Sequence, residues 1–138
     1  MQDIEQLARE LGAALQLSPA YVRWVAAKEQ NEADDALNEM MRELELVRLQ
    51  YQHEAAKNEQ ADQTLMEGCD ARFRGIYDAI MANENMREYQ AAAAALEGLA
   101  KRVTGIVSAC ARGEDPASCQ PEESGCGGSC GGGCKGCG

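Results

Sequence analysis

Between residues 20 and 115 the chain contains no proline, the residue that interrupts an α-helix most strongly. Ala, Glu, Leu, Gln and Met, all good helix formers, dominate residues 1–112. A length of 138 residues leaves room for one modest core. We therefore predict an all-α protein with an N-terminal helix pair and a long antiparallel helical hairpin in residues 1–112. A flexible Cys/Gly-rich tail is expected in residues 113–138.

Apolar residues recur at helical spacing along this body. In the expected N-terminal helix pair they are Ile4, Leu7, Ala8, Leu11 and Leu15, then Tyr21, Val22, Val25 and Ala26. In the expected hairpin they are Leu37, Met40, Leu44, Val47 and Tyr51, then Leu65, Cys69, Phe73, Ile76 and Ile80, and finally Met86, Tyr89, Ala93, Leu96, Ala100, Val103, Val107 and Cys110. The last set alternates steps of three and four, which is a heptad seam. So thin a body cannot cover such seams, so we expect a homodimer or a hetero-oligomer.

Four short segments carry signals that start or end helices. Ser18-Pro19 combines an N-cap residue with proline at the first helical position. Residues 31–35 and 82–85 both offer capping side chains, so we expect a break at each. Between these breaks the pattern turns polar over residues 52–63, which predicts a loop or a frayed helix end, with the hairpin reversing near Asn58.

The charge of the chain excludes several functions. A formal net charge of −10 argues against direct binding to a nucleic-acid backbone, which needs a basic face. Anionic membrane surfaces are disfavoured for the same reason, and no segment approaches the ~20 consecutive apolar residues of a membrane span. The acidic start, Met-Gln-Asp-Ile-Glu, does not resemble a secretory signal. We expect a cytoplasmic protein.

The tail is the strongest candidate for chemistry. Its thiols lie among residues that are almost all glycine: Cys126, Cys130, Cys134 and Cys137. Such a segment has no apolar side chains with which to build a core, but glycine lets the backbone wrap closely around a ligand. In a cytosolic protein thiols stay reduced, so the cluster indicates a metal or redox site rather than a disulfide framework.

The ligand spacing favours an iron–sulfur cluster of the 4Fe–4S type. Cys130, Cys134 and Cys137 supply three thiolates, and Cys126 or a cysteine of a partner supplies the fourth. Cys119, in the linker before the tail, is a candidate additional ligand. The same spacing occurs in radical-SAM enzymes, but those need a large α/β barrel around the cluster, so we set that interpretation aside.

Other occupants of the tail remain open. Zinc could use Cys126 with Cys130 and Cys134 with Cys137 as two short knuckles, although only three residues separate them. Copper(I) also suits a flexible thiolate cluster, which would make the chain a metal-handling protein. A Gly/Cys/Ser-rich end is also found in ribosomal peptide precursors, although a long heptad-bearing body argues against a leader. The remaining alternative is a disordered tail without a ligand, which would leave thiols open to oxidation.

Three stretches of the body carry a family resemblance: residues 7–12, L-A-R-E-L-G; Tyr21; and residues 81–89, M-A-N-E-N-M-R-E-Y. The last stretch looks like the pattern N-P-x-V-x-x-Y, with Glu84 in place of the common proline and Met86 in place of valine. On these motifs residues 3–112 resemble the YlbF/YmcA family of small helical bacterial regulators. None of the motifs is catalytic.

This resemblance implies a helical protein that self-associates or pairs with relatives and has no catalytic site of its own. Better-studied members join a YaaT-type partner in a complex that carries iron–sulfur clusters, held in part by cysteines near the C-termini of the small subunits. That complex influences competence, sporulation and biofilm development, and it modulates RNase Y-dependent mRNA processing. We therefore expect a non-enzymatic regulatory or adaptor subunit.

The remaining reactive side chains have simpler interpretations. Cys69 and Cys110 fall on apolar seams, and a buried cysteine behaves as a small hydrophobic residue, so both are expected in the core. His53, the only histidine, lies in a polar stretch and is expected to be solvated. No Ser/His/Asp set, phosphate loop or carboxylate pair occurs with the context that a catalytic site needs.

Overall fold

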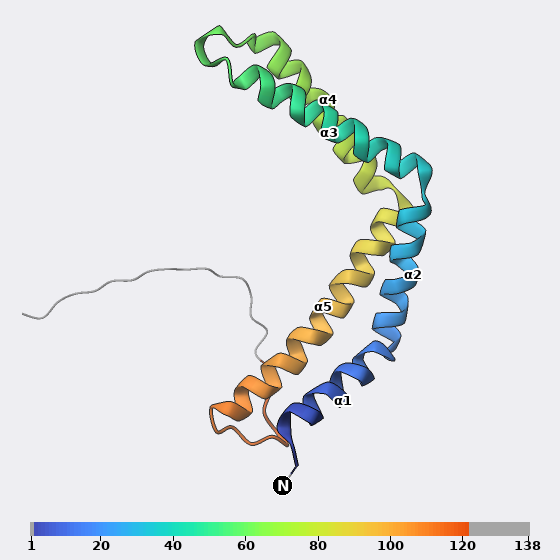
Figure 1. Cartoon of the computed structure of the whole chain (residues 1–138), viewed down its shortest axis with the longest axis vertical. Helices are drawn as coiled ribbons and strands as arrows, with labels where there is room; N and C mark the ends of the chain where they lie inside the picture. The colour runs from blue at the N-terminus through green and yellow to red at the C-terminus, as the bar shows by residue number, and fades with distance from the viewer. Residues whose placement is uncertain (1, 122–138) are drawn as a thin grey trace, which may run out of the picture. The chain divides into compact units, whose positions relative to one another are not determined.

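The computed structural model describes residues 2–121, and within them every regular element is helical, which confirms the all-α prediction (Figure 1). The elements are α1 (Ile4–Gln16), α2 (Pro19–Ala33), α3 (Asp35–Ala55), the short 3₁₀ helix η1 (Asn58–Gln60), α4 (Gln63–Ala82) and α5 (Glu84–Ala111). The chain divides into two compact units, residues 1–97 and residues 98–138, and the division falls inside α5.

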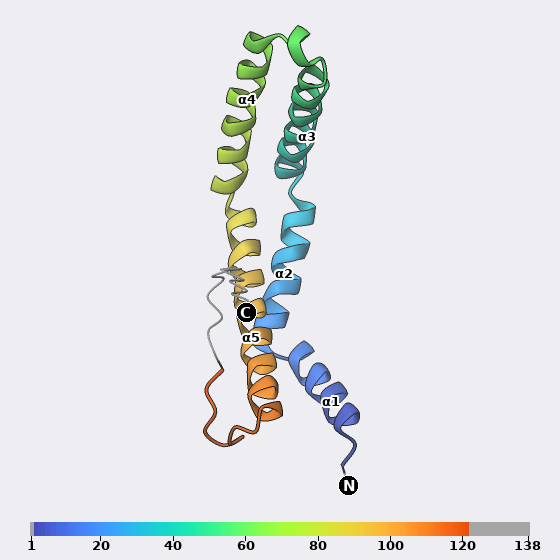
Figure 2. The ribbon, with the colours of Figure 1, turned by 90° about the vertical axis from the view of Figure 1, so that its left-hand side faces the viewer.

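The first unit is built around an antiparallel hairpin of broken helices. Figure 2 shows α3 and α4 side by side, and α2 beside the first part of α5. One limb of the hairpin is therefore α2 followed by α3, and the returning limb is α4 followed by α5 up to residue 97. These two limbs together are called the hairpin.

Short polar side chains start most of the helices, and Ser18 and Asp34 lie where capping residues were predicted. Ser18 caps α2: its Oγ accepts a hydrogen bond from the amide of Tyr21 at 3.3 Å, and Pro19 follows at the first helical position. Asp3, Asp34 and Asp62 cap α1, α3 and α4 in the same way. These contacts satisfy amides that have no partner inside the helix, so each helix start is fixed by its own local sequence.

The hairpin reverses at Asn58, as expected, through a left-handed backbone conformation with φ of 53°. The helix before it is longer than predicted, because α3 continues through Ala55 instead of giving way to a loop at residue 52. The cause is Glu54, which is buried and whose carboxylate accepts hydrogen bonds from Lys57 Nζ at 2.7 Å and from the Asp62 amide at 2.8 Å. His53 is exposed, as predicted.

The buried apolar side chains of the hairpin are Ala27, Leu37, Val47, Cys69, Ile80 and Ala92. Leu37, Val47, Cys69 and Ile80 lie on the predicted seams, so the core interpretation of Cys69 is confirmed. Tyr51 and Leu65, on the same seams, are exposed. In the part of α5 that belongs to the hairpin, the buried position is Ala92 rather than the predicted Ala93, which is only half-buried.

Much apolar surface stays uncovered in the described chain. The helix α1 contains no buried residue, and its apolar stripe faces solvent: Ile4 is 76% exposed, and Leu7 and Leu11 are also exposed. On α3, Leu46 and Leu49 are exposed as well. In the part of the chain that the structure covers, no helix is both long and apolar enough to cross a membrane.

Candidate functional site

The two breaks in the hairpin face each other and are joined by side chains. Asp34 ends α2 and starts α3, while Asn83 ends α4 and starts α5. One carboxylate oxygen of Asp34 accepts from the Leu37 amide at 2.9 Å, and the other accepts from Asn83 Nδ2 at 3.0 Å and from Asn85 Nδ2 at 2.9 Å. We call Asp34, Asn83 and Asn85 the polar junction.

Asn83 has a double role in this junction. Its Oδ1 accepts from the Met86 amide at 3.0 Å and so caps α5, while its Nδ2 donates to Asp34. Glu84 is therefore the first helical residue of α5, a position where proline is also well accommodated and where a carboxylate suits the positive end of the helix dipole. The departure from the N-P pattern at Glu84 is thus structurally neutral.

The capping motifs in the sequence predicted both breaks but not the contact between them. The missed signal is symmetry about the reversal: Asp34 lies 24 residues before Asn58, and Asn83 lies 25 residues after it. In an antiparallel helical hairpin, residues equally far from the turn come close together. The spacing of the two breaks therefore could have predicted their pairing.

The polar junction makes the stability of the fold depend on pH in the acidic range. Hydrogen bonds from the Leu37 amide, and then from Asn83 and Asn85, lower the pKa of Asp34 below its ordinary value of 3.8. A carboxylate with a lowered pKa in the folded state stabilises the fold above its unfolded pKa and loses that effect as pH falls through the folded pKa. The stabilisation from Asp34 is therefore complete at neutral pH and is lost below 3.8.

This dependence can be measured by comparing Asp34→Ala with the parent chain in urea unfolding from about pH 7 to about pH 2. The difference in the free energy of unfolding is expected to be constant near neutrality and to shrink below pH 3.8. The pKa values of Glu45, Glu54 and Glu88 are also lowered, but these groups are present in both proteins and their effects cancel. A difference that does not change with pH would contradict this role for Asp34.

Beside the polar junction, α2 and α5 are held by an ion pair. Arg23 Nε and Nη2 donate to the two carboxylate oxygens of Glu88 at 2.7 and 3.1 Å. A shallow hollow of about 200 Å³ lies here, lined by Arg23, Ala26, Ala27, Gln30, Asn85 and Glu88. Because Arg23 and Glu88 neutralise each other, the hollow presents no free charge to bind a substrate. The pair aligns the two helices.

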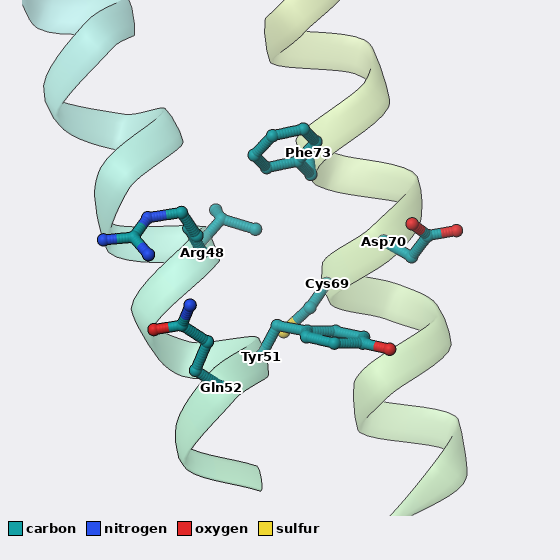
Figure 3. A pocket seen from close by; sticks show the side chains of 7 residues that line it. Arg48, Tyr51, Gln52, Cys69, Asp70 and Phe73 are labelled. Carbon is teal, nitrogen blue, oxygen red and sulfur yellow. The ribbon is translucent and has the colours of Figure 1, made fainter. Parts of the chain in front are cut away.

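A second groove lies between α3 and α4, with a volume of about 280 Å³ (Figure 3). It is lined by Val47, Arg48, Tyr51, Gln52, Cys69, Asp70 and Phe73. Figure 3 shows Arg48 and Asp70 pointing to opposite sides, and each pairs within its own helix, with Glu45 and Arg74 respectively. What remains in the groove is the apolar face around Tyr51, Cys69 and Phe73, which suits packing rather than acid–base chemistry.

In the second unit the end of α5 turns the chain back. Gly113 has a left-handed backbone with φ of +92°, and its amide donates to the carbonyl of Cys110 at 3.0 Å. The amide of Glu114 donates to the carbonyl of Ala109 at 3.1 Å. These two bonds form a Schellman motif, in which glycine avoids the strain that a side chain would cause.

A second turn follows at Asp115. Its carboxylate accepts from the Ala117 amide and from the Ser118 hydroxyl, both at 3.0 Å, and its carbonyl accepts from the Cys119 amide at 2.9 Å. The turn brings the thiol of Cys119 close enough to that of Cys110 for the two side chains to interact. Burial, followed by this contact and by the charges of Cys110, Glu114 and Asp115, raises the pKa of Cys119 above its ordinary value.

The predicted ligand set is only partly placed by the structure. Cys119 is half-buried and contacts Cys110, which is itself half-buried rather than in the core. Cys126, Cys130, Cys134 and Cys137 lie outside the described residues. Within residues 2–121, no three His, Cys, Asp or Glu side chains are grouped closely enough to hold a metal ion.

The fold and the polar junction define a class: a small protein, helical throughout its described residues, built on an antiparallel hairpin whose central breaks are capped by Asp and Asn side chains. A family model described as "Control of competence regulator ComK, YlbF/YmcA" matches residues 4–109. The chain therefore belongs to the YlbF/YmcA family, a family of regulators, as the sequence motifs indicated. Comparison with curated proteins and with solved structures gave no significant match.

Proposed function

We propose that this protein is a non-enzymatic regulatory or adaptor subunit of a cytoplasmic bacterial complex, with an iron–sulfur cluster held by its tail cysteines. The observation that carries the proposal is the extent of the family match. It covers the helical body, residues 4–109, and leaves the cysteine-rich segment as an addition to a regulator scaffold. The proposed role includes developmental regulation and RNase Y-dependent mRNA processing, the processes that the family resemblance implies.

The side-chain chemistry of the body supports an adaptor rather than a catalyst. In the two hollows described above, charged groups are neutralised by neighbours: Arg23 by Glu88, and Asp70 by Arg74. A general base or nucleophile needs a free lone pair directed at a substrate site. The described hollows offer apolar surface instead, which suits protein contacts.

The uncovered apolar residues support assembly with other proteins. Ile4, Leu7 and Leu11 form a stripe on α1, and Leu46 and Leu49 lie exposed on α3. Burying such side chains stabilises an assembly by about 25 cal/mol per Å² of apolar area. We propose that these faces contact a second copy of the chain or related helical subunits, and that a YaaT-type protein, and through it RNase Y, completes the complex.

The chemistry of the donor set fits an iron–sulfur cluster. Cys126, Cys130, Cys134 and Cys137 provide four thiolates, and glycine-rich backbone offers N–H groups that offset the negative charge of the sulfurs. Cys119 is the nearest further thiol in sequence. When bound, the cluster would make assembly sensitive to oxygen and iron supply, since ligated and empty tails differ greatly in order. Zinc bound by the same four thiolates is the alternative.

The test is anaerobic purification of the full-length chain, followed by its absorbance spectrum and its iron, sulfide, zinc and copper content. We expect a brown protein with broad absorbance near ~400 nm and matched iron and sulfide. Changing Cys126, Cys130, Cys134 and Cys137 to Ser is expected to abolish both the colour and the bound iron. Ser124→Ala with Ser129→Ala is the matched control, because it alters the same segment and leaves every thiol in place.

Binding to the proposed partners gives a second readout. The four-cysteine variant is expected to bind a YaaT-type protein more weakly than the Ser124→Ala, Ser129→Ala control under anaerobic, iron-replete conditions. Unchanged affinity would refute the link between cluster and assembly. A colourless protein with stoichiometric zinc would show that the tail cysteines bind zinc instead of an iron–sulfur cluster.

A further inference from the structure

Two thiols in the second unit are brought near each other by the local fold, independently of the tail. Cys110 is on the last turn of α5, and Cys119 lies nine residues later. The Schellman motif at Gly113 reverses the chain, and the turn at Asp115 directs Cys119 back toward the helix. The Cys119 thiol also lies 3.9 Å from the carbonyl oxygen of Pro116, which fixes its position. Both cysteines are half-buried, so neither is sealed from solvent.

The neighbouring side chains leave this pair without a third ligand. Asp115 uses its carboxylate oxygens on Ala117 and Ser118, and Glu114 pairs with Arg112 at 3.5 Å. In the described part of the chain no third metal-ligating group joins the two thiols. A metal site usually needs three or four protein ligands, so the pair is better suited to bonding with itself.

We propose that Cys110 and Cys119 form a reversible disulfide, which staples the segment after α5 onto the end of the helix. Disulfide formation requires Cα atoms about 4.4–6.8 Å apart, and the reversal of the chain at Gly113 and Asp115 already brings the two interacting thiols to the same end of the helix. The proposal goes beyond the regulatory function, since it uses neither the cluster nor the four tail thiols. Cys119 lies seven residues before Cys126, so the staple fixes the point from which the tail departs.

The oxidant is a low-molecular-weight disulfide such as glutathione disulfide. The thiolate of one cysteine attacks a sulfur of the oxidant, forming a mixed disulfide and releasing one thiol. The second cysteine then attacks the protein sulfur of the mixed disulfide, forms the Cys110–Cys119 bond and releases the second thiol. Two electrons pass to the oxidant, and the two protons end on the released thiols. Because the raised pKa of Cys119 lowers its thiolate fraction, we expect slow exchange at neutral pH.

The test uses the full-length chain with Cys126, Cys130, Cys134 and Cys137 changed to Ser, so that the tail cannot compete. The protein is equilibrated with reduced and oxidised glutathione, its free thiols are blocked, and it is digested with trypsin and a glutamate-specific protease. Cys110 then lies in residues 103–112 and Cys119 in residues 115–122, each as the sole cysteine of its peptide. We expect these two peptides to be linked, lighter by two hydrogens than their sum, and to separate on reduction.

Matched variants test whether the fold brings the thiols together. In Gly113→Ala the new Cβ would meet no atom within 4 Å, so no packing contact is disturbed. The left-handed backbone conformation of residue 113 is unfavourable for alanine, so the substitution strains the turn. We expect Gly113→Ala to lower the fraction of chains with the Cys110–Cys119 disulfide several-fold. Unfolding the parent chain in urea is expected to lower that fraction as well. Gly98→Ala, in the helical part of the same unit, is expected to leave the fraction unchanged. Mixed glutathione adducts at Cys110 and Cys119 in place of the link, or equal linkage in native and urea-unfolded chains, would overturn the proposal.

Discussion

Replacing Leu37 by alanine is expected to lower the free energy of unfolding by about 2–5 kcal/mol, a large part of the stability of so small a body. Leu37 is 1% exposed and, with Val47, is one of the two largest fully buried side chains in the described chain. Because the buried apolar set of the hairpin is small and includes alanines, few neighbours can move to fill the cavity. The effect is measured by urea unfolding, followed by far-ultraviolet circular dichroism at a fixed protein concentration.

Leu46→Ala is the matched control for this experiment. It makes the same change in the same helix, but Leu46 is 60% exposed. Its effect on the free energy of unfolding is expected to stay within about 0.5 kcal/mol. If the two variants were equally destabilised, Leu37 would not be the core residue that the structure shows. A loss of self-association in Leu46→Ala, without loss of stability, would support the proposed use of this face in assembly.

Breaking the polar junction is expected to lower the melting temperature by several degrees. In Asp34→Asn the new amide can still cap α3 through its oxygen, but its nitrogen would face the donors of Asn83 and Asn85. In Asn83→Asp the new carboxylate can still cap α5 but would face the carboxylate of Asp34. Each single change thus preserves a helix cap and removes the contact between positions 34 and 83, while in Asn83→Asp the bond from Asn85 to Asp34 remains.

The double variant Asp34→Asn, Asn83→Asp restores the contact between positions 34 and 83 with its polarity reversed, although the amide nitrogen of Asn85 loses its acceptor. The amide at position 34 then donates to the carboxylate at position 83, and both residues still cap their helices. We expect the double variant to be more stable than either single variant, as a double-mutant cycle would report. If the losses of stability in the two single variants simply added up in the double variant, the polar junction would be no more than two independent helix caps. Asp35→Ala, which removes a neighbouring negative charge from the first turn of α3, controls for net charge.

Some contacts of the candidate site depend on the local sequence, and others depend on the arrangement of the whole hairpin. The caps at Ser18, Asp34 and Asn83 could be predicted, because a cap depends on residues within one turn of the helix. The contact between Asp34 and Asn83 joins residues 49 apart and follows only from the register of the hairpin. That register depends on where the chain reverses, and because the reversal lies at Asn58 as predicted, the spacing of the two breaks could have indicated their pairing.

The sequence by itself determined the helical class, the positions of the breaks, the reversal at Asn58 and the family of the protein, because these depend on local propensity and short motifs. Only the tertiary structure decided which seam positions are buried, such as Ala92 in place of Ala93, and which stay exposed, such as Tyr51 and the stripe on α1. The tertiary structure also placed the thiol of Cys119 near that of Cys110. The physical reason is that periodicity defines an apolar face, whereas burial requires a second surface in the right place, and that placement is a property of the whole fold.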